Sequence, residues 1–597
     1  MRVPSEFGLL SFRAQRGISL CARVERGSRR TSCVGGPKIQ SEIPRCARND
    51  NFPLAQTTLR QRPAPAAAHP LPSGEGKEPT PALSSRERGR GQRPDRSVQR
   101  KTRGVARPQQ GEGCAPKWFL PCLALLLLAA PALPRDFPPG ALAPKPLVLP
   151  TPALRVLPNG LKVVVIERHA LPLLTLRLVI KSGAESDPAT LPGTAQLVSA
   201  LLTEGTATRS ASQISETIDS IGGLVDAGGD WDESYLSLSV LNDHEELAFD
   251  LLADMVLHPA FAPAEVERKR KQTLSGLEVV RDDPDYVADV ALRRLAFLGT
   301  SYSHPEDGTI AAVRRITAED LRAFHNSYYQ PSNAVLAVVG DIKTSDALES
   351  AEKRFGAWAN RTSPPIAAPS PEVVSQRIVA IDKPDAVQTE IRIGNLGVPR
   401  NSPDYLALSV ADQILGGPSE NRLFKALRSH HGLTYGASSE LLSYQSAGVW
   451  LAKTFTRTPE TMKSVHLALE QIKRMHDHPI TPQELETAQG YLIGHLALDF
   501  ETSDGVASQT LELLVYNLPL DYWNRFPERI RALTAEEVWN AARQRLAPDN
   551  SIIVLVGNLS NFEKDLKKLG PVQFIPLAQV DFGSQQLVIP KGQTQRQ

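Results

Sequence analysis

The chain has 597 residues, of which 41% are hydrophobic and 22% are charged. This balance suits a globular protein of two to four domains at roughly 150 residues each, and it excludes collagen-like, coiled-coil and wholly disordered chains. The net charge of +2 hides a split, because residues 1–117 hold 23 Lys and Arg against 9 Asp and Glu, whereas the remainder holds 44 against 56. The remainder is therefore acidic, which disfavours nucleic-acid binding.

The five cysteines all lie within the first 122 residues. The rest of the chain therefore offers neither a disulfide framework nor a thiolate metal site. Residues 1–116 are rich in Arg, Pro, Gly and Ser and show no sustained helical or strand period. Because they contain too little apolar surface to offset the entropy of ordering, we expect a basic disordered stretch. This stretch is either an arm for anionic partners or a segment that is not translated, because the true start codon lies downstream.

Residues 117–133 have the plan of a secretory signal peptide, which favours the second interpretation. Lys117 precedes the apolar run 118–133, which contains Ala130-Pro131-Ala132 as a cleavage site. The run is shorter than the roughly 20 residues that a membrane span needs. We therefore expect a periplasmic or otherwise exported protein, cleaved near Ala132 and without a stable membrane span; a retained anchor is the alternative. A Pro-rich linker follows at 134–152.

An internal duplication organises the rest of the chain. Residues 316–340 match 533–557 without a gap at an offset of 217, so that Pro331 corresponds to Pro548 and Asn333 to Asn550. A second match, between the segments that begin at His258 and His478, has an offset of 219 to 220. Two matches at nearly one offset indicate two copies of one unit. We predict one domain at 153–361 and one at 375–580, joined by a linker at 362–374 and followed by a tail at 581–597.

The predicted elements of each copy alternate between strands and helices. Apolar runs at 161–167 and 174–180 predict two strands, with a turn at Asn159-Gly160 before the first. Capping boxes predict helices that begin after Thr317, Thr481 and Thr534. The runs 334–339 and 551–556 predict buried strands that end at Gly. The fold class is therefore α+β, with two homologous repeats, each an antiparallel sheet covered by helices on one face.

Three motifs are typical of one family. They are Leu157-Pro-Asn-Gly-Leu-Lys-Val163, Gly340-Asp-Ile after a Pro-x-Asn strand, and Asn421-Arg-Leu-Phe-Lys-Ala-Leu-Arg428-x-x-x-Gly-Leu-Thr-Tyr435. With these motifs the chain resembles the pitrilysin/insulinase family of zinc peptidases over about residues 155–580. The resemblance implies the LuxS/insulinase-like metalloenzyme fold, with the two repeats forming half of a clam shell.

The zinc motif of that family is degenerate here. Family peptidases contain an inverted His-x-x-Glu-His motif, in which two His side chains bind zinc and the Glu acts as base. The surrounding frame is present at 193–206, but Gln196 and Ala200 occupy the His positions and Ser199 occupies the Glu position. Glu278 matches the distant ligand; it is either a vestigial ligand or a solvated helix carboxylate. Because zinc needs about three protein ligands, we predict no catalytic residue at these positions and no metal bound by this chain.

The second repeat retains a different part of the family's site. The resemblance implies that Arg428 and Tyr435 form the Arg–Tyr pair that completes the substrate site from the half opposite the zinc. An Arg fork can bind a peptide carboxylate or carbonyl, and a Tyr hydroxyl can donate to an oxyanion. The alternative is that Arg428 pairs with a local acid and Tyr435 belongs to the core. Family peptides add a strand to a sheet edge, and the corresponding edge lies at 222–229 and 234–239.

The spacing of the other candidate residues indicates structural roles. Four clustered acidic residues lack the spacing of a cation loop and favour a solvated loop: Asp226, Asp230, Asp232 and Glu233. Two His pairs are not expected to bind metal. We expect His476 and His478 in a surface loop, and His430 and His431 in a solvated turn. The sequence contains no phosphate-binding, dinucleotide-binding or Gly-x-Ser-x-Gly motif.

Three hypotheses for the function remain. In the first, the chain is the non-catalytic subunit of a heterodimeric peptidase, as the resemblance implies for members without the zinc motif; its partner has an intact His-x-x-Glu-His and binds the zinc. In the second, it is a stand-alone peptide-binding protein or a structural assembly protein of the same fold. In the third, it is an active peptidase with displaced ligands. The retained Arg428 and Tyr435 favour the first.

Overall fold

The computed structural model describes residues 149–364, 376–418 and 421–588. The predictions for residues 1–116, 117–133 and most of 134–152 concern residues outside this described part, as does most of the predicted linker at 362–374. Within the described residues, no helix is both long enough and apolar enough to cross a membrane.

The first repeat contains a six-stranded sheet with the strand order β1-β2-β6-β3-β5-β4. Neighbouring strands are antiparallel except β2 and β6, which are parallel. The predicted runs at 161–167, 174–180 and 334–339 correspond to β2, β3 and β6. The strands are β1 (Ala153–Val156), β2 (Lys162–Glu167), β3 (Leu173–Ile180), β4 (Leu224–Gly229), β5 (Ser234–Leu241) and β6 (Ala334–Gly340).

The helices of the first repeat begin at the predicted signals. Thr317 and Asp320 form a complete capping box, with each side chain accepting the other's backbone N–H, and this box begins α9 as predicted. The helices are α3 (Thr194–Leu201), α4 (Ala211–Ser220), α5 (Glu245–Leu257), α6 (Pro263–Val280), α7 (Pro284–Ala296), α8 (Ile310–Val313), α9 (Ala318–Tyr328) and α10 (Thr344–Phe355).

The second repeat has a matching sheet with the order β12-β7-β11-β8-β10-β9. Its strands are β7 (Arg377–Asp382), β8 (Gln388–Leu396), β9 (Ala437–Ser443), β10 (Gly448–Arg457), β11 (Ile552–Gly557) and β12 (Val572–Pro576). The outer strand differs between the repeats, because β12 comes from the C-terminal end of its repeat and pairs in parallel, whereas β1 comes from the N-terminal end and pairs antiparallel. The two-repeat fold class is thus confirmed, with sheets that are mixed rather than purely antiparallel.

The helices of the second repeat follow the same plan. Capping boxes at Thr481 and Thr534 begin α14 and α17 as predicted. The helices are α11 (Tyr405–Gly416), α12 (Arg422–Phe424), α13 (Thr461–Asp477), α14 (Pro482–Asp499), α15 (Ser503–Val515), α16 (Tyr522–Ala532), α17 (Ala535–Arg545) and α18 (Glu563–Leu566), and a π-helical turn, Lys425–His430, continues α12.

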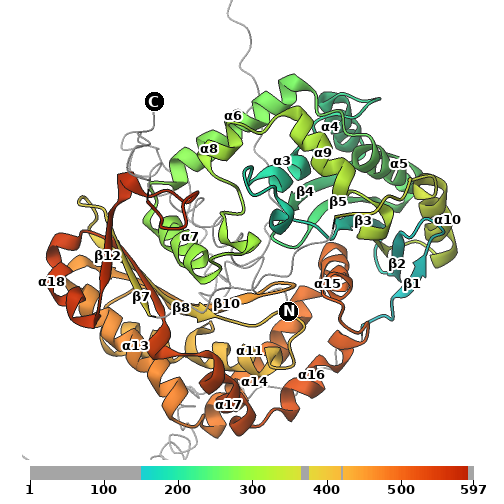
Figure 1. Ribbon diagram of the computed structural model, residues 1–597. Helices are drawn as coiled ribbons and strands as arrows, with labels where there is room; N and C mark the ends of the chain where they lie inside the picture. Colours follow the sequence, from blue (N-terminus) through green and yellow to red (C-terminus); the bar gives the residue numbers. More distant parts are fainter. Residues whose placement is uncertain (1–148, 365–375, 419–420, 589–597) are drawn as a thin grey trace, which may run out of the picture. The chain divides into compact units, whose positions relative to one another are not determined.

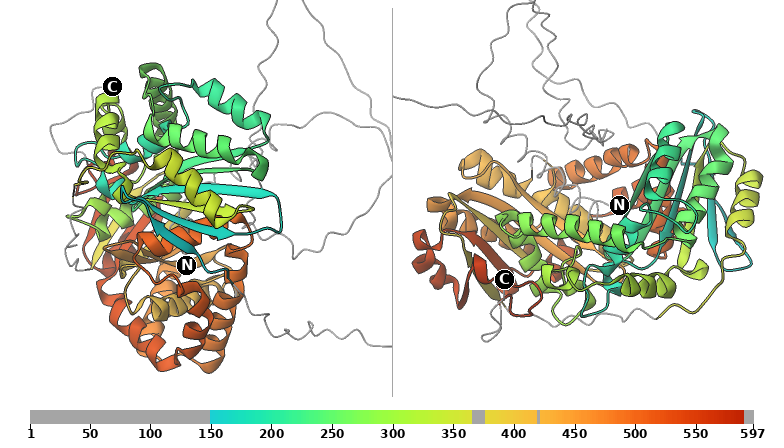
Figure 2. Two further views of the ribbon diagram at one scale, coloured as in Figure 1. Left: turned by 90° about the vertical axis from the view of Figure 1, so that its right-hand side faces the viewer. Right: turned by 90° about the horizontal axis from the view of Figure 1, so that it is seen from above.

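Each sheet has a helix from the other repeat on its second face. Helix α15 of the second repeat contacts β3 and β6, and α7 of the first repeat contacts β8 and β11 (Figures 1 and 2). The sequence predicts helices on one face only, so this exchange is an addition to the predicted fold. As a result, both hydrophobic cores contain residues of both repeats; Val554 of β11 belongs to the core of Phe249, and Val164 of β2 to that of Trp450.

The same pair of residue types holds both exchanged helices. Asp504 is the second residue of α15 and pairs with Arg177 of β3, while Asp285 is the second residue of α7 and pairs with Arg392 of β8. The two arginines occupy equivalent positions, opposite the fourth residue of each repeated strand run, at 337 and 554. The exchange is therefore a property of the duplicated unit.

Candidate functional site

Helix α3 contains the degenerate motif, and a glycine and a carboxylate side chain fix its start. Gly193 precedes the helix with a φ of 98°, a conformation that glycine adopts without strain. The Asp187 carboxylate accepts hydrogen bonds from the backbone N–H groups of Gly193 (2.6 Å) and Ala195 (2.7 Å). The frame of the zinc motif therefore folds as an ordinary capped helix, with 196 and 200 on its partly exposed face.

Gln196 links three parts of the first repeat. Its Nε2 donates to the carbonyl of Gly229 at the end of β4 (2.9 Å) and to Oε1 of Glu306 (3.4 Å). Burial raises the pKa of Glu306 well above its usual range, and the neighbouring Asp307 adds to this. The amide that replaces the first zinc-binding His is thus engaged in a structural bridge from α3 to the strand end and to the loop before α8.

Ser199 is closed off from solvent. It is fully buried, and its hydroxyl donates to the carbonyl of Ala195 one turn earlier (2.8 Å). A Cβ built on Gly229 would lie 3.5 Å from the Ser199 Oγ, so the end of β4 fills the space beside this hydroxyl. Ala200 contributes no polar atom. The position of the family's catalytic Glu is therefore occupied by a small side chain under a strand end.

The donor set does not fit zinc. Glu278 lies on α6 with its side chain 55% exposed, 3.6 Å from the guanidinium of Arg314. Across 149–364, 376–418 and 421–588, no group of three or more His, Cys, Asp or Glu side chains is arranged to hold a metal ion. Since an amide and a hydroxyl that already donate hydrogen bonds are poor zinc ligands, we derive no step through a metal on this chain.

Arg428 and Tyr435, both in the block 421–435, lie together in the structure. The Arg428 guanidinium lies over the Tyr435 ring, with its carbon 4.3 Å from the ring centroid, and Nη1 donates to the Tyr435 carbonyl. The same guanidinium carbon lies 5.0 Å from the centroid of the Phe424 ring. Tyr435 is 75% exposed, so the alternative that it is a core residue is not supported. The pair forms a stacked, solvent-facing cation–aromatic surface.

The turn between the two residues fixes this arrangement. The Asn421 side chain caps α12 by accepting from the Phe424 N–H (2.7 Å), and the helix then widens into the π-helical turn that contains Arg428. Gly432 has a φ of 60°, which reverses the chain so that the Leu433 N–H reaches the Leu427 carbonyl (2.9 Å). Because π-helical turns recur at functional sites, this local geometry agrees with a role for Arg428 beyond packing.

The predicted solvated acidic loop is wrong for its central residues. Asp232 is fully buried and accepts hydrogen bonds from the hydroxyls of Tyr302 (2.6 Å) and Tyr516 (3.0 Å) and from the Gln445 N–H (2.9 Å). Burial raises the pKa of Asp232 to about 7, and neighbouring Asp230 adds to this. Tyr516 and Gln445 belong to the second repeat, so Asp232 joins the two repeats.

Aromatic rings surround this junction, and sequence reasoning missed them. Tyr302 stacks on Tyr444 with ring centroids 5.2 Å apart, and Trp231 lies 5.6 Å from Tyr302. These rings come from the turn between β4 and β5, the segment before α8 and the turn between β9 and β10. Each sits beside a short polar segment, so no hydrophobic period marks them as core.

The remaining predicted residues lie apart from the motif. His430 and His431 are exposed in the turn before Tyr435, and His478 is exposed at the end of α13. His476 lies in the last turn of α13 beside Asp477 (2.8 Å). In the described residues, therefore, these histidines show no metal-site geometry.

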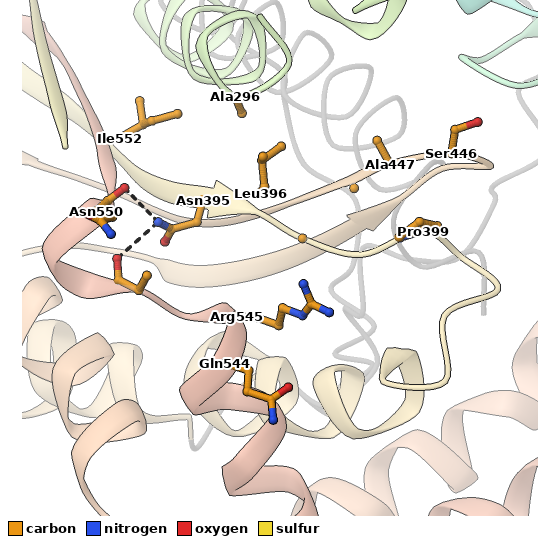
Figure 3. A pocket seen from close by; sticks show the side chains of 13 residues that line it. Ala296, Asn395, Leu396, Pro399, Ser446, Ala447, Gln544, Arg545, Asn550 and Ile552 are labelled. Carbon is orange, nitrogen blue, oxygen red and sulfur yellow. Dashed lines mark hydrogen bonds between the residues drawn. The ribbon is translucent and has the colours of Figure 1, made fainter. Parts of the chain in front are cut away.

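A cavity of about 390 Å³ lies between the end of β8, the turn before β10 and the end of α17 (Figure 3). Its wall is built mainly of small residues, and the side chain of Arg545 in it pairs with Asp404 at 3.3 Å. None of the predicted site residues lines this cavity, so it is separate from both parts of the candidate site.

Comparisons with known proteins identify the family. A family model described as insulinase (peptidase family M16) matches residues 162–308, and one described as peptidase M16 inactive domain matches residues 315–492. An uncharacterized zinc protease of Mycobacterium leprae is 30% identical over 359 residues, covering 59% of this chain and 80% of that protein. The chain belongs to the insulinase family of peptidases, M16.

Other M16 relatives have names that imply different roles. A non-peptidase homolog, YmxG, of Helicobacter pylori is 24% identical over 409 residues, covering 67% of this chain and 93% of that protein. A probable mitochondrial-processing peptidase subunit beta of Arabidopsis thaliana is 26% identical over 278 residues, covering 46% and 52%. Both zinc proteases and non-peptidases are therefore named among its relatives, and the choice depends on the residues of this chain.

A solved M16 structure supports the fold described above. The peptidase M16 inactive domain from Pseudomonas fluorescens superposes with a TM-score of 0.65 and 30% sequence identity, covering 68% of this chain and 98% of that chain. This M16 chain is thus a family member whose motif positions 196, 199 and 200 hold no zinc-binding side chain.

Proposed function

We propose that this M16 chain is the non-catalytic subunit of a two-subunit peptidase. It contributes Arg428 and Tyr435 to a peptide substrate, while a partner subunit with an intact His-x-x-Glu-His binds the zinc and cleaves the peptide. The observation that supports this most is the contrast between the two repeats. In the first repeat, the amide of Gln196 donates to the Gly229 carbonyl and Ser199 is buried, whereas the Arg428–Tyr435 pair of the second repeat faces solvent.

The geometry of the pair suits a peptide ligand. One N–H of the Arg428 guanidinium donates to the Tyr435 carbonyl, which leaves further donors of the fork for a peptide carbonyl or carboxylate. Contacts with the rings of Phe424 and Tyr435 hold the fork in one orientation before a ligand arrives, which lowers the entropy lost on binding. The exposed Tyr435 hydroxyl is available to donate to an oxyanion on a substrate held by the partner.

The relatives agree with a divided activity. The Arabidopsis relative is named as a subunit, and the Helicobacter relative is named as a non-peptidase. As part of the same proposal, the chain acts outside the cytoplasm, because segment 117–133 has the plan of a cleaved signal peptide.

The test uses the full chain and a candidate partner, a relative with an intact motif encoded by a neighbouring gene. Cleavage of a mixed peptide pool is followed by mass spectrometry for each protein alone and for the mixture. We expect cleavage by the mixture and its loss in R428A or Y435F. The matched control is R543A, because Arg543 also lies over an aromatic ring, that of Trp539 at 4.9 Å, but outside the block 421–435.

The other outcomes separate the alternatives. Zinc-dependent cleavage by this chain alone would overturn the proposal in favour of displaced ligands. Cleavage by the partner that does not change when this chain is added, together with peptide binding by this chain, would favour the stand-alone peptide-binding role. Equal losses in R428A and R543A would show that the Arg–Tyr pair has no special part.

A further inference from the structure

Four exposed leucines gather at one end of the first sheet. Leu173 and Leu241 form the outermost pair of β3 and β5, and Leu224, the first residue of β4, lies opposite Ser239, two residues before Leu241. Since strand residues alternate between faces, these three leucines share one face. Leu171 precedes β3 in the same turn, and its carbonyl accepts from the Leu173 N–H (2.8 Å). All four are exposed, Leu224 to 69%.

The fold itself does not require these leucines, as the second repeat shows. There the outermost pair of β8 and β10 is Gln388 and Arg457, and the residue before β9 is Gly436. The duplicated sheet therefore forms equally well with polar or small residues at these places. Exposed leucines on a sheet face do not stabilise the folded chain, and contiguous exposed apolar groups commonly mark binding surfaces.

The place of the leucines in the repeat also points to binding. Strands β4 and β9 are the edge strands of their sheets in the described residues. In the second repeat, Tyr435 lies two residues before β9, with the Arg428 guanidinium on its ring. In the first repeat, the same end of the edge strand begins with Leu224. The two repeats thus present a cation–aromatic surface and an apolar surface at matching positions.

We propose that Leu224, with Leu241 behind it, forms a subsite for one large apolar side chain of an extended peptide that pairs with β4. Leu171 and Leu173 lie beyond β5 and continue the apolar surface past the subsite. The subsite deepens the proposed function, on which it rests for the peptide nature of the ligand. A strand added beside β4 lies about 4.8 Å away and places every second side chain on the face of Leu224. One of these side chains then covers Leu224 and reaches toward Leu241.

The subsite has room for a single apolar position. Two residues after Leu224, on the same face, Asp226 accepts a hydrogen bond from the Tyr235 hydroxyl (2.8 Å). Ser239 and Ser237 follow on β5 on that face. The neighbouring peptide positions on this face therefore meet polar groups, so the ligand is a peptide with one large apolar residue flanked, two positions away, by polar residues.

The test measures peptide binding to the full chain by fluorescence anisotropy. The probe is a labelled ten-residue peptide of Ser, Thr and Lys with one central Leu, and its control has Ser in place of that Leu. We expect the Leu peptide to bind at least about 10-fold more tightly, and L224S/L241S to remove this preference. The conservative variant L224I/L241I keeps it, and so does the matched control V279S, which removes an equally exposed apolar side chain from α6.

Hydrogen exchange locates the peptide. Bound Leu peptide should protect backbone amides of β4, at 224–229, in the wild-type chain and not in L224S/L241S. Equal binding of the two peptides, protection confined to β9, or an unchanged preference in L224S/L241S would each overturn the inference. Because cleavage by the mixture with the partner depends on Arg428 and not on this preference, a failed subsite leaves the proposed function standing, and the reverse result is also distinguishable.

Discussion

Removing Arg392 should destabilise the chain far more than removing the equivalent Arg177. We consider R392M and R177M, which delete the same atoms and the same charge at matching positions of the two sheets. Arg392 is 1% exposed and contacts three carboxylates, those of Asp285 and Asp289 on α7 and that of Glu390. Arg177 is also buried, but its partner Asp504 is 49% exposed and 3.3 Å away.

The magnitudes follow from what each substitution leaves behind. Without Arg392, three partly buried carboxylates lose their shared cation, with Lys453 and Arg293 as the remaining nearby positive charges, and breaking a buried pair of this kind costs about 3–5 kcal/mol. Without Arg177, Asp504 turns to water, so the ion pair contributes at most about 1 kcal/mol. Loss of the stacking of Arg177 on Tyr235, at 3.9 Å, adds about 1 kcal/mol. We expect a difference of about 2 kcal/mol or more.

Urea unfolding followed by circular dichroism and tryptophan fluorescence measures both losses. A further variant sharpens the test, because adding Asp289→Asn to R392M removes one uncompensated carboxylate and should recover part of the lost stability. Adding Asp504→Asn to R177M should recover little, since that carboxylate is already hydrated. Equal losses in R392M and R177M, or no recovery on adding Asp289→Asn, would refute the argument from carboxylate number and burial.

Three further predictions follow from the same structure. Because burial raises the pKa of Asp232 to about 7, above its unfolded value of about 3.9, the folded state holds more protons between these values, and stability should fall as pH rises through this window; urea midpoints at pH 5 and pH 8 should differ less in D232N. Restoring His-x-x-Glu-His at 196–200 should not give stoichiometric zinc after a chelator wash, because Glu278, which matches the third ligand, is exposed and lies beside the guanidinium of Arg314; one zinc per chain by mass spectrometry would contradict this. Gly308→Ala should lower the melting temperature much more than Gly432→Ala, since both have positive φ but only the Gly308 Cβ would meet backbone, 2.2 Å from the Pro192 carbonyl.

Much of the fold was predictable because its signals are local. Capping boxes at Thr317, Thr481 and Thr534 place helix starts within a few residues, and the duplicated Pro331 and Pro548 each begin a short 3₁₀ turn before a buried strand. These patterns depend on hydrogen bonds between near neighbours, so a short window contains all the information. The pairing of Arg428 with Tyr435 was accessible for the same reason, since seven residues and one turn separate them.

The exchange of helices was not predicted, although a trace of it is present in the sequence. Asp285-Tyr-Val-Ala and Asp504-Gly-Val-Ala match at an offset of 219 and begin α7 and α15. The match shows that the helix is repeated, but an amphipathic pattern does not say which sheet its apolar face covers. The residues that pair with the two helices, Arg177 and Arg392, each lie far along the chain from the helix that they contact.

The prediction of a solvated loop at Asp230–Glu233 was wrong for a related reason. Composition alone places a segment such as Asp230–Glu233 at the surface, because isolated carboxylates are costly to bury. Here the cost is offset by donors from Gln445 and Tyr516, more than 200 residues away, and by Tyr302. No window around the turn contains these groups, so the burial becomes visible only when the two repeats are in contact.

Comparing matching positions of the two repeats separates residues that the fold needs from residues with another role. Residues that the fold needs recur in both repeats, as Arg177 and Arg392 do, because each copy has the same sheet to build and the same kind of helix to hold. An exposed residue that only one copy has at a matched position needs another cause. Arg428 with Tyr435 in the second repeat and Leu224 with Leu241 in the first are of this kind. Both sets are therefore the residues to which we assign contacts with the proposed peptide.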